Sequence, residues 1–275
     1  MGIREDLLAG RIKIGVWGTG FIGFSTMAYY AEKGVKAVGY DIDRKKVDDI
    51  NRGVCPIVGL EHWLGFEVEP LVKNGLIKAT TDHRDLLKQD IPVHFIGVPT
   101  ENGAEPWLDA LHDVIKKMDF PPGMSHKPAV IVESTITPGA TDREVIPLFE
   151  EKGYRVGEDI LLGVAPRRDW FVSPEKNLYN LPRVYGGVNK VANKIMLEVL
   201  SIVCRRLVEA PDHRHAEVVK SIENAYRHMD ITLANQLTFA YPSLNMKKVL
   251  ELVGTKWNVE TYIPSFGTGG YCIPL

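Results

Sequence analysis

Three glycines near the start of the chain, Gly18, Gly20 and Gly23, have the spacing G-x-G-x-x-G. They lie between a short apolar run and a segment of helical composition, and Asp41 ends the next apolar run about 20 residues further on. In this pattern the first glycine allows a tight turn, the second lets the backbone approach a pyrophosphate, and the third lets helix and strand pack closely. The pattern predicts a dinucleotide site at a helix N-terminus, although the glycines alone would also suit a plain strand–helix turn.

Asp41 indicates which dinucleotide is bound. Its carboxylate would accept hydrogen bonds from the ribose hydroxyls and repel a 2′-phosphate, which favours NAD over NADP, whereas Arg44 lies close enough to weaken that preference. Two later segments follow predicted strands, and ligands of open α/β sheets bind outside the carboxyl ends of strands; taken separately, either segment could be an ordinary turn. The other predicted cofactor-binding residues are Phe21, Ile22, Val98, Pro99, Thr100, Ser134 and Thr135.

A second group of residues could carry out chemistry. Lys220 and Asn224 are four residues apart in a helical segment and share one face, where together they could hold a water or a developing alkoxide; the alternative is a solvated helix face. Cys272 follows the glycine-rich segment 267–270, which would let the backbone approach a ligand. A cysteine nucleophile reacts as the thiolate, while the alternative is a small buried hydrophobe.

Composition excludes several classes of partner. The 33 basic and 35 acidic residues give a net charge of −2, with no basic stripe for nucleic acid. The longest apolar runs, such as residues 129–132, are strand-sized and too short to cross a bilayer. The first residues include acids and no apolar segment, so we expect no secretory signal and no membrane partner.

The cysteines favour a reducing compartment. Cys55, Cys204 and Cys272 are odd in number and far apart, which argues against a disulfide framework and predicts a cytoplasmic protein. His213 and His215 lie in a polar stretch without evident metal-ligand partners, so no metal site is predicted.

Short apolar segments alternate with amphipathic helical ones, which predicts βαβ units and a doubly wound, Rossmann-type parallel sheet. After Gly187 the chain becomes mainly helical, with one long helix whose apolar positions recur every three or four residues. We assign residues 1–207 to a NAD-binding domain and residues 208–275 to a central helical region ending in the cysteine loop. Predicted strands are 12–17, 36–40, 93–98, 129–133, 160–164 and 184–185; predicted helices are 22–33, 44–52, 107–118, 142–152, 190–207, 215–240 and 245–253.

Taken together, six segments resemble the UDP-glucose/GDP-mannose dehydrogenase family over essentially the whole chain. The GGYCIP form of the cysteine loop is closer to the branch that acts on N-acetylated hexosamine nucleotides. The matching segments are the fingerprint containing Gly18, DIDRKKVDDINRG, VPT, ESTITPGAT, AEVVKSIENAYRHMDITLANQL and FGTGGYCIP.

The resemblance implies an activity and roles for single residues. Members of the family oxidise the C6 alcohol of a nucleotide sugar to a carboxylate, using two NAD per turnover. Cys272 would form a thiohemiacetal and then a thioester, Lys220 and Asn224 would stabilise oxyanions and hold water, and Thr135 would lie beside that water and the nicotinamide. The implied partners are a nucleotide-sugar substrate and a second copy of the chain, packed through the long helix 215–240. The expected substrate-binding residues are Arg167, Arg168, Lys220, Asn224, Phe266, Gly267 and Gly269.

Two departures from the family pattern matter. Arg167 stands where the family usually has the glutamate that serves as its general acid/base; an arginine cannot be a base, but it could bind a phosphate or a carboxylate. The family also continues beyond the cysteine with an aspartate and a third domain that binds the substrate nucleotide, whereas this sequence stops at Leu275. We therefore expect a fragment or a short form that binds NAD and holds the sugar nucleotide poorly.

Two other functions stay open. One is a 3-hydroxyacid or 6-phosphogluconate type of dehydrogenase, which would not need Cys272. The other is a NAD-binding or assembly protein of the same ancestry with altered or no oxidation chemistry, as suggested by Arg167.

Overall fold

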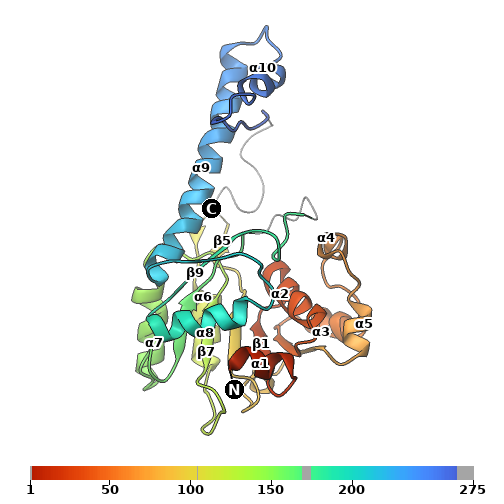
Figure 1. Cartoon of the computed structure of the whole chain (residues 1–275), viewed down its shortest axis with the longest axis vertical. Helices are drawn as coiled ribbons and strands as arrows, with labels where there is room; N and C mark the ends of the chain where they lie inside the picture. The colour runs from red at the N-terminus through yellow and green to blue at the C-terminus, as the bar shows by residue number, and fades with distance from the viewer. Residues whose placement is uncertain (1, 104, 169–174, 265–275) are drawn as a thin grey trace. The chain divides into compact units, whose positions relative to one another are not determined.

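The computed structural model of the protein describes residues 2–103, 105–168 and 175–264 (Figure 1). The chain separates into two compact units. Unit 1 consists of residues 1–100 and 107–218, and unit 2 of residues 101–106 and 219–275. The domain boundary at 207/208 stays a prediction.

Unit 1 is built on an eight-stranded sheet with the strand order β10-β9-β8-β7-β4-β1-β2-β3 in the described residues. Neighbouring strands run parallel, except that β8 and β9 are antiparallel. The strands are β1 (Ile14–Trp17), β2 (Ala37–Tyr40), β3 (Ile77–Thr80), β4 (Val93–Ile96), β7 (Ala129–Val132), β8 (Leu161–Val164), β9 (Arg183–Gly187) and β10 (Leu207–Glu209).

The central strands explain why the sequence shows continuous apolar runs rather than alternation. Every residue of β1, β4, β7 and β8 is buried, because helices cover both faces of a parallel sheet. The strand order reverses between β1 and β4, and a doubly wound sheet offers a ligand crevice at such a point.

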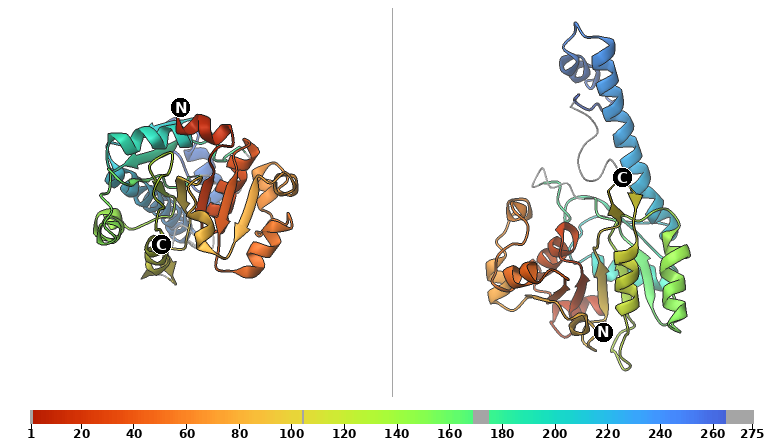
Figure 2. Two further views of the ribbon diagram at one scale, coloured as in Figure 1. Left: turned by 90° about the horizontal axis from the view of Figure 1, so that it is seen from below. Right: turned by 180° about the vertical axis from the view of Figure 1, so that it is seen from behind.

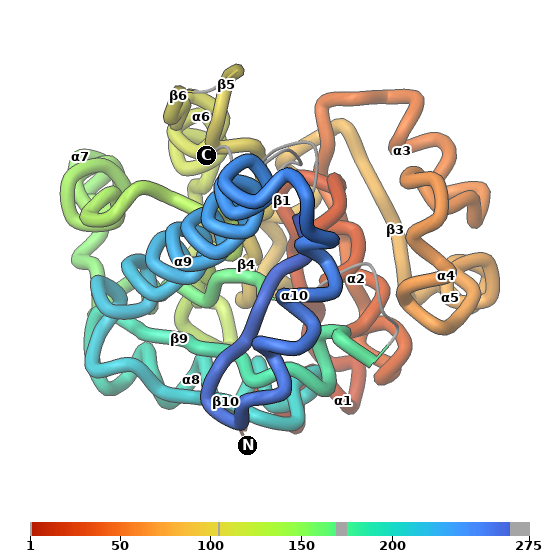
Figure 3. The backbone as a smooth tube through the Cα atoms, turned by 90° about the horizontal axis from the view of Figure 1, so that it is seen from above, coloured from red at the N-terminus to blue at the C-terminus, as the bar shows by residue number. Residues whose placement is uncertain are grey.

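Helices lie on both faces of this sheet. Helices α1, α2 and α8 cover one face and α6 and α7 the other, while α3, α4 and α5 gather beside β3 (Figures 1, 2 and 3). Tyr30 on α2 donates its hydroxyl to the carbonyl of Val199 on α8 at 3.0 Å, which joins two helices of the first face. This arrangement confirms the predicted doubly wound α/β fold. The helices of unit 1 are α1 (Ile3–Leu8), α2 (Phe21–Glu32), α3 (Arg44–Asn51), α4 (Leu60–Leu64), α5 (Glu69–Lys73), η1 (His83–Leu86), α6 (Asp109–Lys117), η2 (Thr141–Val145), α7 (Ile146–Glu151) and α8 (Lys190–Leu200).

Several boundaries differ from the predicted ones. The helix expected over 190–207 ends at Leu200, because the chain turns at residues 201–204 and returns to the sheet as the edge strand β10. Strand β9 is longer than the strand expected at 184–185, and strand β3 was not predicted. The unpredicted strands β3 and β10 form the two edges of the eight-stranded sheet, where short, partly exposed segments lack an apolar run.

The long predicted helix is present as α9 (His213–Ala240), which begins two residues earlier than expected. Its first turns belong to unit 1 and the remainder to unit 2. Unit 2 also contains α10 (Met246–Val253) and the hairpin of β5 (Glu101–Asn102) and β6 (Glu105–Pro106). Its small core is formed by Ala234, Met246 and Leu250, with Leu237 and Val249 packed against them. No helix within the described ranges is long and apolar enough to span a membrane.

Candidate cofactor site and the residues around it

The glycine turn after β1 has the geometry that each glycine predicts. Gly18 adopts a φ of +86°, and a Cβ there would meet the carbonyl oxygen of Gly97 at 2.7 Å. A Cβ on Gly23 would lie 1.8 Å from the carbonyl oxygen of Gly18, so α2 can approach β1 only with glycine at this position. Gly20 differs, since a Cβ there would have no heavy atom within 4 Å. The open side of the turn is therefore at Gly20, where a pyrophosphate would approach the N-terminus of α2, and the turn fits a dinucleotide.

Asp41 lies at the end of β2, with an exposure of 7%. Its Oδ2 accepts hydrogen bonds from the backbone N–H and the hydroxyl of Thr19, both at 2.8 Å, and from the ammonium of Lys46 at 3.0 Å. Its Oδ1 accepts from the backbone N–H of Asp43 at 3.0 Å. Burial works to raise the pKa of Asp41, but these hydrogen bonds outweigh it and hold the pKa below its usual value. The carboxylate is thus kept charged and fixed beside the glycine turn.

Two residues of this arrangement were not predicted from the sequence. Thr19, between the first two glycines, orients Asp41, and Lys46 rather than Arg44 pairs with it. Arg44 is the exposed first residue of α3. Since α3 begins directly after the capping residue Asp43, Lys46 in its first turn could have been recognised as a neighbour of Asp41.

The two loops expected to line the cofactor lie side by side. The hydroxyl of Ser134 donates to the carbonyl oxygen of Val98 at 2.8 Å, and the hydroxyl of Thr100 donates to the carbonyl oxygen of Thr135. Pro99 between them is exposed, and Thr135 is half-buried. The structure therefore brings together the segments after β4 and β7, and β4 is the direct neighbour of β1, which leads into the glycine turn.

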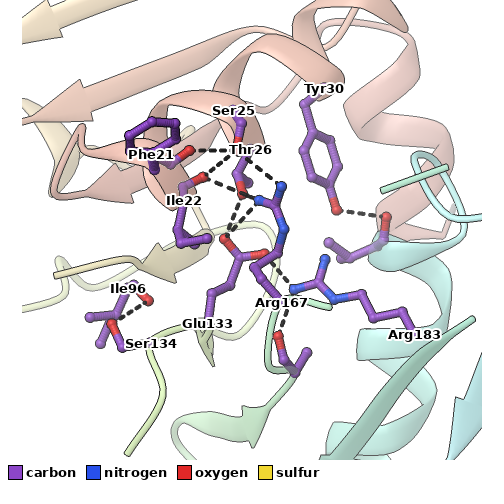
Figure 4. Close-up of polar contacts among 12 residues, drawn as sticks. Phe21, Ile22, Ser25, Thr26, Tyr30, Ile96, Glu133, Ser134, Arg167 and Arg183 are labelled. Carbon is purple, nitrogen blue, oxygen red and sulfur yellow. Dashed lines mark hydrogen bonds and ion pairs between the residues drawn. The ribbon is translucent and has the colours of Figure 1, made fainter. Parts of the chain in front are cut away.

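A buried cluster of charged residues lies behind these loops (Figure 4). Glu133, 1% exposed, accepts a hydrogen bond from the Thr26 hydroxyl at 2.5 Å and pairs closely with Nη2 of Arg183. The Nη1 atom of Arg167 lies 3.9 Å from Glu133 Oε2 and donates to the Thr26 hydroxyl at 2.6 Å. It also donates to the carbonyl oxygen of Ile22 at 3.1 Å, while Nη2 donates to the Ser25 hydroxyl at 3.0 Å.

Arg167 lies within this buried cluster, and its role in substrate binding stays a prediction. The side chain is 3% exposed, and its described contacts are with α2 and Glu133. The neighbouring Arg168 is half-buried and donates to the carbonyl oxygen of Pro182 at 2.9 Å. Its role in substrate binding stays a prediction.

The start of α9 is hydrogen-bonded to the segment that follows Thr135. Glu217, 2% exposed, accepts hydrogen bonds from the backbone N–H groups of Gly139 and Thr141, both at 2.8 Å. Asp142 accepts from His213 at 3.0 Å and pairs with Arg214. Glu217 was not predicted as a site residue, because a lone glutamate on a helix carries no signal of its partners.

The structure describes only some of the predicted catalytic and substrate-binding residues. Lys220 is half-buried and Asn224 is 7% exposed, and both lie on α9 at the spacing of one helix face. Cys272, Phe266, Gly267 and Gly269 lie outside the described residues. No group of metal-ligating side chains is found within residues 2–103, 105–168 and 175–264.

Comparison with known proteins gives the family. The model of the UDP-glucose/GDP-mannose dehydrogenase NAD binding domain matches residues 12–203, and the model of the family's central domain matches residues 214–275. UDP-N-acetyl-D-mannosamine dehydrogenase of Pyrococcus horikoshii is 30% identical over 96% of this chain and 62% of its own length. UDP-N-acetyl-D-glucosamine 6-dehydrogenase of Pseudomonas aeruginosa is 26% identical over 95% of this chain and 61% of its length.

Comparison with solved structures points to the same family. The structure of the UDP-D-ManNAc dehydrogenase from Pyrococcus horikoshii superimposes with a TM-score of 0.85 at 31% identity, covering 96% of this chain and 62% of that one. The chain thus spans about three-fifths of the length of these relatives. The family domain that contains the glycine turn and Asp41 confirms the predicted cofactor, NAD. The chain belongs to the UDP-glucose/GDP-mannose dehydrogenase family.

Proposed function

We propose that the protein is a nucleotide-sugar 6-dehydrogenase, of which this chain supplies the NAD-binding domain and the central region. The observation that carries the proposal is the match of both family domains along the chain, together with a glycine turn that is open at Gly20 and an ionised Asp41 beside it. The relatives named for UDP-N-acetylated hexosamines support a UDP-N-acetylhexosamine as substrate.

In the proposed reaction this chain's own residues hold the sugar through two oxidations. Bound NAD accepts the hydride in each oxidation. The thiolate of Cys272 adds to C6 of the aldehyde, forming a C–S bond and placing charge on the oxygen, and the resulting thiohemiacetal loses the second hydride to become a thioester. Water then attacks the thioester carbon, the C–S bond breaks, and the carboxylate product leaves the cysteine free.

Lys220 and Asn224 are proposed to stabilise the negative oxygen in these steps and to hold the attacking water. Thr135 is proposed to orient that water beside the nicotinamide. Half-burial of Lys220 and Thr135 and burial of Asn224 suit such roles, because charges and hydrogen-bonding groups act more strongly where water is partly excluded.

The family's usual acid/base glutamate is replaced by Arg167, which cannot accept a proton at ordinary pH and lies in the buried cluster. This observation favours a second candidate function: a NAD-binding protein of this family that stops after one oxidation or performs none. The match of both family domains argues against the third possibility, a 3-hydroxyacid or 6-phosphogluconate type of enzyme.

We further propose a homodimer through α9 and a cytoplasmic location. Several apolar side chains of α9 are exposed at helical spacing and would be covered in a dimer: Ile222, Tyr226, Met229 and Leu233. A reducing compartment would keep the Cys272 thiol available for catalysis.

The test is to count the NADH formed per sugar by the protein, including any sequence that follows Leu275, with a panel of UDP-, GDP- and dTDP-sugars. The dehydrogenase predicts two NADH per sugar, and loss of this activity in Cys272→Ala. One NADH per sugar, or none with NAD binding intact, would support the second candidate function instead.

A further inference from the structure

The first turn of α2 is bonded to a cation that comes from another part of the chain. Residues 18–25, which form the glycine turn and the start of α2, contain no charged side chain of their own. Arg167, in the loop after β8, donates to the carbonyl oxygen of Ile22, the second residue of α2, and to the hydroxyls of Ser25 and Thr26 (Figure 4). A full positive charge thus lies within one helical turn of the backbone N–H groups at Phe21 and Ile22.

That charge is shielded from water. Arg167 is 4% exposed and Glu133 is 1% exposed, so the field of the cluster acts through protein rather than through bulk solvent. Glu133 is shared between two guanidinium groups, with the closer contact to Arg183 and the 3.9 Å contact to Arg167. Among the described residues, the two guanidinium groups of Arg167 and Arg183 and the one carboxylate of Glu133 give the cluster a formal net charge of +1.

The N-terminus of a helix binds phosphate through its free N–H groups and its dipole. Because NAD carries two negative charges on its pyrophosphate, a buried cation behind the same N–H groups should add to that attraction. We propose that Arg167 is an electrostatic component of the NAD site: it strengthens binding of the pyrophosphate from beneath α2 without touching the cofactor. This inference rests on NAD binding and is independent of whether the sugar is oxidised.

The test measures dissociation constants for NADH, by the change in its fluorescence, with the intact chain and four variants. We expect Arg167→Gln to weaken NADH binding roughly ten-fold, the size expected of one unit charge acting over several ångströms of protein. Arg167→Lys keeps the charge and should stay within about three-fold of the wild type. Thr26→Val removes a hydrogen bond of the cluster and no charge, so its affinity should be unchanged within about two-fold. Lys13→Gln removes a cation that pairs with Asp90, immediately before β1, and should also have no effect.

A fifth variant separates electrostatics from packing. Glu133→Gln removes the negative charge of the cluster while keeping its shape, so we expect it to tighten NADH binding several-fold, opposite in sign to Arg167→Gln. Competition experiments against NADH compare ADP-ribose, which contains the pyrophosphate, with adenosine, which does not. Arg167→Gln should weaken the binding of ADP-ribose and not that of adenosine.

Three outcomes would overturn the proposal. They are equal NADH affinity in Arg167→Gln and wild type, equal weakening in Thr26→Val and Arg167→Gln, and weaker rather than tighter binding in Glu133→Gln. If Arg167→Gln does not fold, Glu133→Gln and Arg167→Lys decide the question, because a purely structural role predicts weaker binding in both. Loss of sugar oxidation in any variant does not enter the test, so failure of the dehydrogenase proposal remains distinguishable.

Discussion

Glu217 Oε2, on the first turns of α9, accepts a hydrogen bond from the backbone N–H of Gly139 at 2.8 Å. Its Oε1 accepts from the backbone N–H of Thr141 at 2.8 Å and from the Thr141 hydroxyl. The helical segment that begins at Thr141 has no side-chain cap of its own, since its N-cap residue is Ala140. The Glu217 carboxylate, which belongs to α9, therefore caps this helical segment, and it also holds the segment that follows Thr135 in place.

Removing this carboxylate should destabilise unit 1. In Glu217→Ala two N–H groups would lose their acceptors in a buried place, which costs about 2–4 kcal/mol of the free energy of unfolding. Glu217→Gln keeps one acceptor oxygen and should lose about half as much. The measurement is urea unfolding followed by tryptophan fluorescence. The matched control is Glu158→Ala, which breaks an exposed pair with Arg155 and should change stability by less than about 1 kcal/mol. Equal stability of Glu217→Ala and Glu158→Ala would contradict the capping role.

The charge of Asp41 should set the choice of dinucleotide. Asp41→Asn keeps an oxygen for the N–H of Thr19 but loses the charge, and it leaves the Lys46 ammonium without its carboxylate partner. We expect the ratio of NADH to NADPH affinity to fall at least about ten-fold, because a 2′-phosphate would no longer be repelled and would meet a cation instead.

Dissociation constants for both cofactors, measured at one ionic strength, check this expectation. Asp43→Ala is the matched control: it removes the neighbouring carboxylate that caps α3, through its bond to the N–H of Lys46, and should leave the ratio unchanged. If Asp41→Asn keeps the wild-type ratio, Asp41 does not select the cofactor.

The buried pair of Trp17 and His94 should make stability depend on pH. Trp17 Nε1 donates to His94 Nδ1 at 3.1 Å, and burial lowers the pKa of His94 from 6.5 to about 4. The folded protein therefore keeps His94 neutral while the unfolded chain takes up a proton below pH 6.5. Stability from this residue is fully present above pH 6.5 and is lost progressively down to pH 4, by about 3 kcal/mol in total.

His94→Gln should flatten this dependence, because glutamine can accept the Trp17 hydrogen bond and does not titrate in this range. Urea midpoints at several pH values between 4 and 7.5 provide the measurement. Asp82 and Asp159, whose pKa values are lowered to about 2 by arginine partners, affect stability only below their ordinary pKa of 3.8, where the carboxylates become protonated. A wild-type curve that is flat from pH 6.5 to 4 would show that His94 is not held neutral.

The glycine turn could be predicted from the sequence because the spacing of its glycines follows from steric requirements. A Cβ at Gly18 or Gly23 would clash with the backbone, and a Cβ at Gly20 would occupy the open side of the turn. The meeting of the Val98 and Ser134 loops was also predictable, since neighbouring parallel strands end at one edge. Both inferences use rules that hold for any chain with this fold.

Arg167 shows what such rules leave out. The sequence indicates that a cation replaces an expected acid, but not whether its side chain turns outward to a substrate or inward to α2. Its partners Ile22 and Thr26 lie more than 140 residues away in the chain, so the direction depends on tertiary packing and not on the local sequence. The same holds for Glu217 and for the pair of Trp17 and His94, whose meaning depends on neighbours distant in sequence.

The exposed apolar face of α9 should make the protein a dimer in solution. Tyr226 and Met229 are both 65% exposed and lie on one side of the helix with Ile222 and Leu233, which are 49% and 59% exposed. A helix in water rarely leaves four large apolar side chains uncovered along one face, and a second copy of α9 would bury them.

Tyr226→Glu and Met229→Glu should each shift the protein from dimer to monomer in light scattering after size exclusion, because a buried unpaired carboxylate is costly. His228→Glu places the same charge on an exposed polar position of the helix and should leave the dimer intact. A monomeric wild type, or a dimer that tolerates Met229→Glu, would show that this face has another purpose.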